Sequence, residues 1–339
     1  MSGPAVWVIV VNWNGREHLE TCLGSLDRQT YPDRHVVLID NGSSDGSVEL
    51  ARDRFPSVEI IANDRNLGFC DANNQGLRRA IESGVPYAVL LNNDTETDPR
   101  WIEELVRVAE QNPRIGALSS KMLMFDRRDT INSAGLCCSV IGCGWDRGFG
   151  EQDGPPWNEP TEVLGASGGA FFVRTDALRK TGLLPRFGIY LEDLDLSLRL
   201  WNAGYTIEYV PTAVVYHKFS ATMASRRNRY RRAYLNARNR MRVVLRQFPI
   251  KHWPLICVRF VRAETRAIGR PIKDGEWWKA RAEIRAIFAA GLYKPVAMAE
   301  RCRAWAAGRG RCRFWHMIDK TTDFFPGADA VGNGTEINE

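Results

Sequence analysis

Apolar and polar positions alternate in blocks along the first hundred residues. Apolar runs rich in Val, Ile and Leu, which are typical of strands buried on both faces, occupy residues 5–11, 36–39, 58–61 and 87–91. Patterns typical of amphipathic helices lie between and after them, near residues 17–29, 46–55, 70–83 and 99–111. This β-α-β-α order predicts an α/β fold with a doubly wound, mostly parallel sheet flanked by helices.

Polar side chains follow each of the four predicted strands at the point where the strand ends. The segments are NWNG at 12–15, DNGSSDGS at 40–47, NDRNLGF at 63–69 and NNDTE at 92–96. Turn formation explains any one of them as well as ligand binding does, because Asn, Asp, Gly and Ser all suit turns. Ligands of doubly wound sheets bind in the crevice at the carboxyl ends of the strands. The four segments together therefore favour a nucleotide or sugar crevice.

Asp94 follows the fourth predicted strand directly, in the segment LLNNDTE. A carboxylate in this position suits a hard divalent cation, which prefers oxygen ligands and commonly keeps substrate phosphates in its coordination shell. A Mg²⁺ or Mn²⁺ ion there would neutralise the charge that develops on a diphosphate leaving group. The alternative is that Asp94 only caps the helix that begins near Pro99.

A second acidic cluster lies in YLEDLDLSLRL at residues 190–200, which predicts an amphipathic helix. Glu192, Asp193 and Asp195 fall in its first turn, where the positive end of the helix dipole favours acids. Because three neighbouring carboxylates repel one another, we expect one of them to have a raised pKa and to serve as a general base. The alternative is a charged helix start without chemistry.

Three smaller features have a structural and a functional interpretation. Gly168 and Gly169, in GASGGAFFVR, would let the backbone approach a substrate closely or would form a tight turn. His217 ends the apolar run VPTAVVYH, where a lone histidine is more often packed or solvated than a ligand. GCGWDRG at 142–148 lacks the spacing of a dinucleotide-binding fingerprint and carries no prediction.

Seven segments, in this order, resemble the family 2 glycosyltransferases, which have the GT-A fold, and among them the bacterial rhamnosyltransferases. Between residues 5 and 220 they are VNWNG, IDNGSSDGS, NLGFCDANNQG, LLNNDTE, GASGGAFFVR, LEDLDLSLRL and AGYTIEYVPTAVVYH. The resemblance implies an inverting hexosyltransferase acting in cell-surface polysaccharide synthesis in the cell envelope. It would move a sugar, with rhamnose as the first expectation, from a dTDP- or UDP-sugar to a hydroxyl of a glycan or lipid-linked acceptor.

The resemblance also implies which residues bind the nucleotide-diphospho-sugar donor. Asp40 would contact the uracil or thymine base, with Asn12 beside it. Asn66 and Asn74 would line the nucleotide-sugar pocket. Asn92 stands where the D-x-D element usually has its first acid, and is expected among the donor-binding residues.

The same resemblance implies the catalytic and metal-binding residues. Asp94 would be the metal-bridging carboxylate of the D-x-D element, and His217 would complete the site for Mg²⁺ or Mn²⁺. Asp193 would be the catalytic base that deprotonates the acceptor hydroxyl in a single inverting displacement.

Charge divides the chain of 339 residues into unlike parts. Thirteen Lys or Arg residues and no Asp or Glu lie between 209 and 263, within a net charge of +6. This shift predicts a catalytic domain at 1–220, a basic, aromatic-rich helical extension at 221–325, and a disordered tail at 326–339. The extension either packs on the catalytic domain or lies on anionic lipid, with its membrane anchors at Trp253, Phe260, Trp277 and Trp278.

Composition and missing motifs narrow the classes of protein. Hydrophobic residues at 44% and charged residues at 25% exclude a disordered or fibrous chain. No apolar run reaches 18 residues, and no basic region precedes the first apolar stretch. We therefore expect a cytoplasmic protein, peripheral on the inner face of the membrane at most.

Two other classes of protein are weighed against the glycosyltransferase. A sugar nucleotidyltransferase would carry a G-x-G-T/S-R-L loop after the first strand, where NWNGREHL stands. A non-enzymatic membrane or RNA adaptor would not need acids at the strand ends. Nucleic acid is an unlikely partner, because the sequence holds no recognisable nucleic-acid-binding module.

Overall fold

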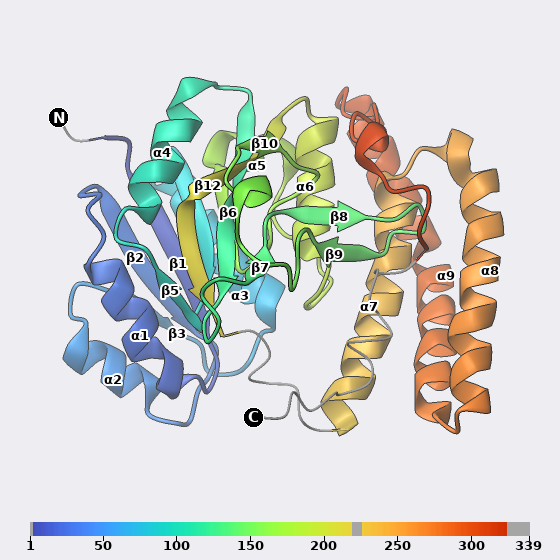
Figure 1. Ribbon diagram of the computed structural model, residues 1–339, viewed down its shortest axis with the longest axis horizontal. Helices are drawn as coiled ribbons and strands as arrows, with labels where there is room; N and C mark the ends of the chain where they lie inside the picture. The colour runs from blue at the N-terminus through green and yellow to red at the C-terminus, as the bar shows by residue number, and fades with distance from the viewer. Residues whose placement is uncertain (1–2, 219–225, 324–339) are drawn as a thin grey trace.

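A mixed sheet forms the centre of the computed structural model, which describes residues 3–218 and 226–323 (Figure 1). The predicted strands form a parallel block in the order β4-β1-β2-β3, with bounds Tyr87–Asn92, Val6–Asn12, Arg34–Asp40 and Glu59–Ala62. The predicted helices are α1 to α4, with bounds Arg16–Asp27, Ser47–Arg54, Phe69–Glu82 and Trp101–Gln111. The α/β prediction for this part of the chain is confirmed.

The second half of the sheet contains antiparallel strands. β11 (Ala170–Arg174) runs antiparallel between β4 and β6 (Ile115–Met124), and β12 (Thr206–His217) runs parallel to β6. Three short strands complete this half, namely β5 (Thr95–Thr97), β7 (Ile131–Ser133) and β10 (Thr161–Glu162). β8 (Leu136–Cys138) and β9 (Gly144–Asp146) form a separate hairpin. The remaining catalytic helices are α5 (Thr175–Thr181) and α6 (Glu192–Asn202).

An irregularity in β12 places its last residue. Val210 pairs with Ser120 and Val214 with Lys121, so three extra residues bulge out of β12 between the two pairs. Bulges of this kind bend a strand and re-aim the side chains beyond them. Beyond the bulge, His217 pairs with Thr95 of β5, immediately after Asp94.

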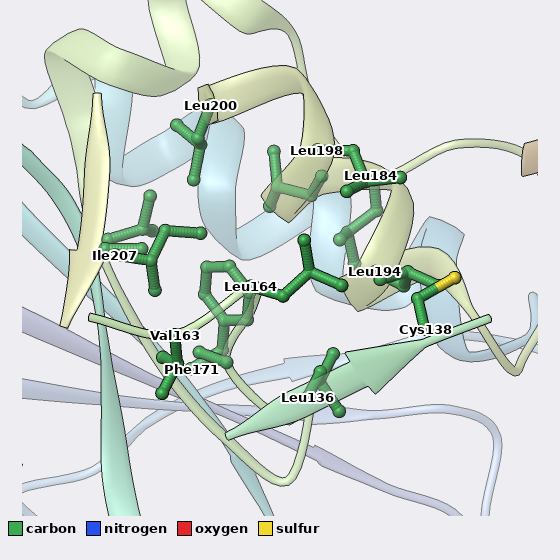
Figure 2. Close-up of a cluster of buried hydrophobic side chains, with 14 of the residues drawn as sticks. Leu136, Cys138, Val163, Leu164, Phe171, Leu184, Leu194, Leu198, Leu200 and Ile207 are labelled. Carbon is green, nitrogen blue, oxygen red and sulfur yellow. The ribbon is translucent and has the colours of Figure 1, made fainter. Parts of the chain in front are cut away.

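Helices cover both faces of the sheet. Side chains of β1 alternate between the faces, so that Val8 and Val10 pack with α1 and α4 while Ile9 packs with α3. On this second face α6 lies over the sheet and the β8–β9 hairpin, with Leu194 and Leu198 turned towards Leu164 (Figure 2). Each fully buried aliphatic side chain contributes about 1.5–3 kcal/mol. The position of α6 is therefore fixed by its apolar face.

The C-terminal extension consists of α7 (Arg226–Gln247), α8 (Trp253–Lys273), α9 (Trp277–Ala306) and the segment that follows them. α7 lies between the sheet domain and the α8–α9 pair (Figure 1). Val243, Val244 and Phe248 at its end belong to the same buried cluster as α6. The expected boundary near residue 220 and the expected tail at 326–339 lie outside the described residues. In the part of the chain that is described, no helix has the length and apolar character needed to cross a membrane.

Three of the four expected membrane anchors are not exposed. Trp253 packs against the Arg301 guanidinium, Phe260 against Arg240, and Trp278 near Lys279. These three aromatic rings are partly buried against basic side chains, and their role as membrane anchors stays a prediction. The exposed apolar side chains of α8 and α9 are Leu255, Val258, Val261, Trp277, Ile284, Ile287, Phe288, Leu292, Val296 and Trp305.

Candidate active site

The carboxyl ends of β1, β2 and β4 form a polar floor. Asn12 Nδ2 donates to Asp40 Oδ1 at 3.0 Å, and Asn93 Nδ2 donates to Asn12 Oδ1 at 2.7 Å. Asp40 Oδ2 accepts from the backbone N–H of Ser43 at 2.8 Å. Asn12 and Asp40 are fully buried, so the two predicted donor-binding residues are held in one arrangement. Asn93, which sequence reasoning did not single out, joins them to β4.

The two asparagines expected in the donor pocket have different surroundings. Asn66 is exposed, and its Oδ1 accepts from Asn41 Nδ2 at 3.0 Å and from the backbone N–H of Gly68 at 2.8 Å. Asn74 is buried in α3, where its amide both donates to and accepts from the backbone of Leu184, each at 3.0 Å. The side chain of Asn74 therefore fixes the loop before α6, whereas that of Asn66 faces solvent beside the floor.

Asp94 and His217 meet beside β4. His217 Nε2 lies 3.2 Å from Asp94 Oδ1, and its Nδ1 lies 2.9 Å from Asn132 Oδ1. Because a carbonyl oxygen only accepts, Nδ1 carries a proton and Nε2 points to the carboxylate. Burial alone would raise the pKa of Asp94, but the hydrogen bond and charge of His217 outweigh it and lower that pKa. Asn92 Nδ2 completes the group at 3.4 Å from His217 Nε2.

One oxygen and one nitrogen aimed at each other are suitable ligands for Mg²⁺ or Mn²⁺. They are too few for a complete site: within residues 3–218 and 226–323, no three His, Cys, Asp or Glu side chains gather as metal ligands. The pair fits an ion that takes its other ligands from a substrate and from water.

Asp193 occupies the first turn of α6. Its Oδ2 accepts from the backbone N–H of Gly168 at 2.8 Å and its Oδ1 from that of Leu194 at 2.7 Å. Burial outweighs these hydrogen bonds and raises the pKa of Asp193. The pKa of neighbouring Glu192 is raised further, by burial and by the charge of Asp193. The expected raised pKa in this cluster is thus found at the first two acids.

The two glycines of GASGGAFFVR allow close approaches between segments of the protein itself. A Cβ at Gly168 would lie 3.3 Å from Asp193 Oδ2, and one at Gly169 would lie 2.7 Å from Met122 Cε. The close approaches are therefore to Asp193 and to β6. The carbonyl of Gly169 also accepts from the N–H of Asn92 at 3.0 Å. Two adjacent residues thus join Asp193 to the segment that carries Asp94.

A strained turn presents the acidic end of α6. Tyr190 and Leu191 have φ values of 74° and 64°, a region that costs non-glycine residues free energy. Asn239 of α7 is fully buried, and its Nδ2 donates to the carbonyls of Ile189 at 2.9 Å and Tyr190 at 2.8 Å. Asn239 of the extension therefore stabilises the turn that immediately precedes Asp193.

Residues 7–182 match the family described as glycosyl transferase family 2. The chain belongs to this family. It is 32% identical over 244 residues to the N-acetylglucosaminyl-diphospho-decaprenol L-rhamnosyltransferase of Mycobacterium tuberculosis, a match that covers 63% of this chain and 76% of that protein. It is also 34% identical over 219 residues to the glycosyltransferase AglE of Haloferax volcanii, covering 63% of this chain and 67% of AglE.

Solved structures confirm the fold of this glycosyltransferase. GalNAc-T7, crystallised with UDP, GalNAc and Mn²⁺, superposes with a TM-score of 0.56 at 19% identity, over 71% of this chain and 47% of its own. TarS 1–349 of S. aureus in complex with UDP gives 0.51 at 15% identity, over 90% of this chain and 89% of its own. The predictions of a GT-A fold, of family 2 and of a rhamnosyltransferase-like hexosyltransferase are confirmed.

Asp195 is excluded as the base of the glycosyltransferase. Its carboxylate is fully buried and lies 2.8 Å from Arg199 Nε, 2.8 Å from Arg246 Nε and 2.9 Å from Gln247 Nε2. Burial would raise its pKa, but the two guanidinium charges outweigh burial and lower it. Of the three acids grouped by sequence, Asp195 joins α6 to α7 and takes no part in proton transfer.

Asp146 of β9 is an acid that sequence reasoning missed. Its carboxyl group is hydrogen-bonded to Ser133 and Ser167, and its Oδ1 is a buried atom without a hydrogen-bond partner among the described residues. Burial, with a contribution from the charge of Asp193, raises its pKa to about 6. Ser133 follows the histidine partner Asn132, and Ser167 precedes Gly168. Asp146 therefore lies near both His217 and Asp193, on a strand too short for a sequence pattern.

Proposed function

We propose that this glycosyltransferase moves rhamnose from a nucleotide-diphospho-sugar to a hydroxyl of a lipid-linked glycan in cell-surface polysaccharide synthesis. The named substrate of the Mycobacterium tuberculosis relative supports the sugar and the acceptor class. The observation that carries the proposal is the link through Gly168 and Gly169, which places Asp193 and the Asp94 segment at one edge of the sheet. A base and a diphosphate-binding group must face each other across the anomeric carbon in an inverting transfer.

Asp193 acts as the base in the proposed mechanism. It takes the proton of the acceptor hydroxyl as that oxygen attacks the anomeric carbon on the face opposite the diphosphate. The new glycosidic C–O bond forms while the bond from the anomeric carbon to the diphosphate oxygen breaks. The nucleoside diphosphate leaves with the bonding electrons, and the configuration at the anomeric carbon is inverted. The raised pKa of Asp193 makes its carboxylate a stronger base than an exposed aspartate.

The donor lies along the polar floor in this proposal. Asp40 contacts the pyrimidine base of a dTDP- or UDP-sugar, with Asn12 and Asn66 beside it. Asp94 and His217 would hold a Mg²⁺ or Mn²⁺ ion, with Asn92 next to them. When bound, that ion neutralises charge on the departing diphosphate. The proximity of His217 Nε2 to Asp94 Oδ1 supports this assignment. Oxygens of the bound diphosphate would supply further ligands of the ion.

Calorimetric titration of the protein with dTDP, UDP and GDP, each with and without Mn²⁺, tests the donor site. We expect tight, metal-dependent binding of one pyrimidine diphosphate. Absence of binding by all three nucleotides, in protein shown to be folded, would remove the donor-site assignment. Release of dTDP from dTDP-rhamnose in the presence of a lipid-linked glycan then tests the sugar and the acceptor.

Replacement of the base separates chemistry from binding. Asp193→Asn keeps the shape of the side chain but cannot take a proton, so we expect turnover to fall by roughly 10²–10⁴-fold. The dissociation constant for the donor, measured by the same calorimetry, should stay within about twofold, because no donor contact is lost. Retention of turnover by Asp193→Asn would place the base elsewhere, with Glu192 the next candidate.

The exposed apolar side chains of α8 and α9 support a peripheral position on the cytoplasmic face of an anionic membrane. Soluble monomers rarely expose contiguous apolar patches of large size. Basic side chains, among them Arg262, Arg266 and Arg281, are exposed on the same two helices. Apolar groups flanked by cations are typical of helices that lie at the surface of an anionic bilayer.

A further inference from the structure

A large basic cavity lies away from the active-site edge of the sheet. It has a volume of about 1090 Å³ and opens between the loop at 181–186, the far end of α6, the turn between α7 and α8, the end of α9 and residues 309–315. Arg199 and Asn202 of α6 line it, whereas Asp193 lies in the first turn of that helix, about 9 Å and 14 Å along the axis from these two residues. The cavity is therefore separate from the donor crevice.

The cavity wall carries uncompensated positive charge. Arg186, Lys251, Arg303 and Arg311 are exposed lining residues, and none of these four is within ion-pair distance of an acid among the described side chains. Glu300, an acid in the lining, already pairs with Arg246 at 2.5 Å. Cations so placed recognise phosphate groups.

Two further residues of the lining are consistent with a positively charged cavity wall. The pKa of His252 is lowered by partial burial and by the neighbouring positive charge of Lys251. Arg199 also lines the cavity, but its guanidinium already forms an ion pair with Asp195. A phosphate group entering the cavity would therefore meet cations whose charge is not already neutralised by a carboxylate of the protein.

Apolar side chains form another part of the same wall. Ile250, Val296 and Trp305 line the cavity and are 57%, 48% and 77% exposed. From Val296 the exposed apolar surface continues along α9 to Leu292 and Phe288, at helical spacings of four residues. A ligand that contacts both parts of the wall needs an anionic group and an apolar part. A free phosphate has no apolar part and therefore fits less well.

We propose that this cavity binds the phosphate headgroup of an anionic membrane phospholipid while Phe288, Leu292 and Val296 lie among the acyl chains. This inference rests on the proposed membrane contact and assigns it a specific headgroup site. Charge complementarity selects the anionic lipid, and the continuous apolar strip on α9 selects a bilayer over a soluble phosphate.

Co-sedimentation with vesicles tests the proposal on the full-length protein. Vesicles of phosphatidylcholine alone are compared with vesicles that also contain phosphatidylglycerol. We expect the wild-type protein to bind only the anionic vesicles. The double charge reversal Arg303→Glu and Arg311→Glu should weaken this binding by roughly 30-fold or more, at about 1 kcal/mol for each cation.

A matched control separates the cavity from net charge. Arg52→Glu with Arg78→Glu changes the net charge equally at exposed positions of α2 and α3, and should retain nearly wild-type vesicle binding. Equal loss in the cavity variant and in this control would overturn the headgroup site. Circular dichroism and an unchanged melting temperature establish that each variant is folded.

A third variant distinguishes failure of this inference from failure of the membrane proposal. Leu292→Ser removes an apolar side chain that is 84% exposed, so folding should not depend on it. Loss of vesicle binding in Leu292→Ser but not in the cavity variant would keep the membrane contact and overturn the headgroup site. No vesicle binding by wild type would overturn both proposals. Binding of pyrophosphate by calorimetry that is lost in the cavity variant, without vesicle binding by the wild type, would assign the cavity to a soluble anion and overturn the lipid.

Discussion

Single residues of the site are held in arrangements that cost stability. The raised pKa of Asp146, about 6 against an ordinary value of 3.8, means that the folded protein binds this proton more tightly than the unfolded chain. Stability therefore decreases as pH rises from about 4 to 6, and the ionised group disfavours folding at pH 7. The cost of two pKa units is at most about 3 kcal/mol. A carboxyl retained at such a cost is typical of a functional site.

We expect Asp146→Asn to be more stable than the wild type at pH 7 by about 1–2 kcal/mol, because it removes the buried charge. The difference should shrink at pH 4, where the wild-type carboxyl is protonated. Urea unfolding of both proteins at the two pH values measures this. Equal stabilisation at both pH values would show that ionisation of Asp146 is not the cause.

The proposed metal-binding pair, Asp94 and His217, gives a second prediction at this scale. His217→Gln places an amide near Asp94 and removes the imidazole nitrogen, so the gain in nucleotide affinity on adding Mn²⁺ should fall by about 10-fold or more. Nucleotide affinity without metal should be nearly unchanged. His316→Gln, an exposed histidine remote from the site, is the control. An undiminished Mn²⁺ effect in His217→Gln would remove this histidine from the metal site.

At the scale of elements, the local sequence pattern predicted the residues at the strand ends but not the contacts between segments distant in the sequence. Apolar runs and strand-end residues placed Asn12, Asp40 and Asp94 together, because parallel strands end at one edge of a sheet. The pairing of Asp195 with Arg246 and the support that Asn239 gives to residue 190 were not predictable. Each joins segments about fifty residues apart, and the extension showed only a high content of arginine. The bulge in β12 leaves no local signal for the position of His217 either.

Asn239 tests whether α7 supports catalysis. Asn239→Ala removes the donors that hold the strained carbonyls of residues 189 and 190, and buried carbonyls without partners cost about 1–3 kcal/mol each. We expect kcat to fall at least several-fold while the donor KM changes little. Asn236→Ala is a matched control on the same helix, since among the described residues its amide donates to the carbonyl of Arg232 and to no other group. Similar kcat values for the two variants would contradict a positioning role.

At the scale of the whole molecule, the catalytic sheet and the extension share one buried cluster and a network of buried charges. Arg246 contacts Asp195 of α6 and Glu300 of α9, so its guanidinium joins three helices. Removal of one member of a buried ion pair typically costs 3–5 kcal/mol, because the partner charge stays buried. The extension should therefore unfold together with the catalytic domain.

We expect Arg246→Ala to lower the free energy of unfolding by about 3 kcal/mol in a single transition. Arg303→Ala, a truncation of an exposed arginine on α9, should change it by less than about 0.5 kcal/mol. Tryptophan fluorescence and far-ultraviolet circular dichroism, followed in urea, should give coincident curves for wild type and both variants. Two separate transitions in the wild type would show that the extension folds independently, and Arg246 would then not couple it to α6, the helix that carries Asp193.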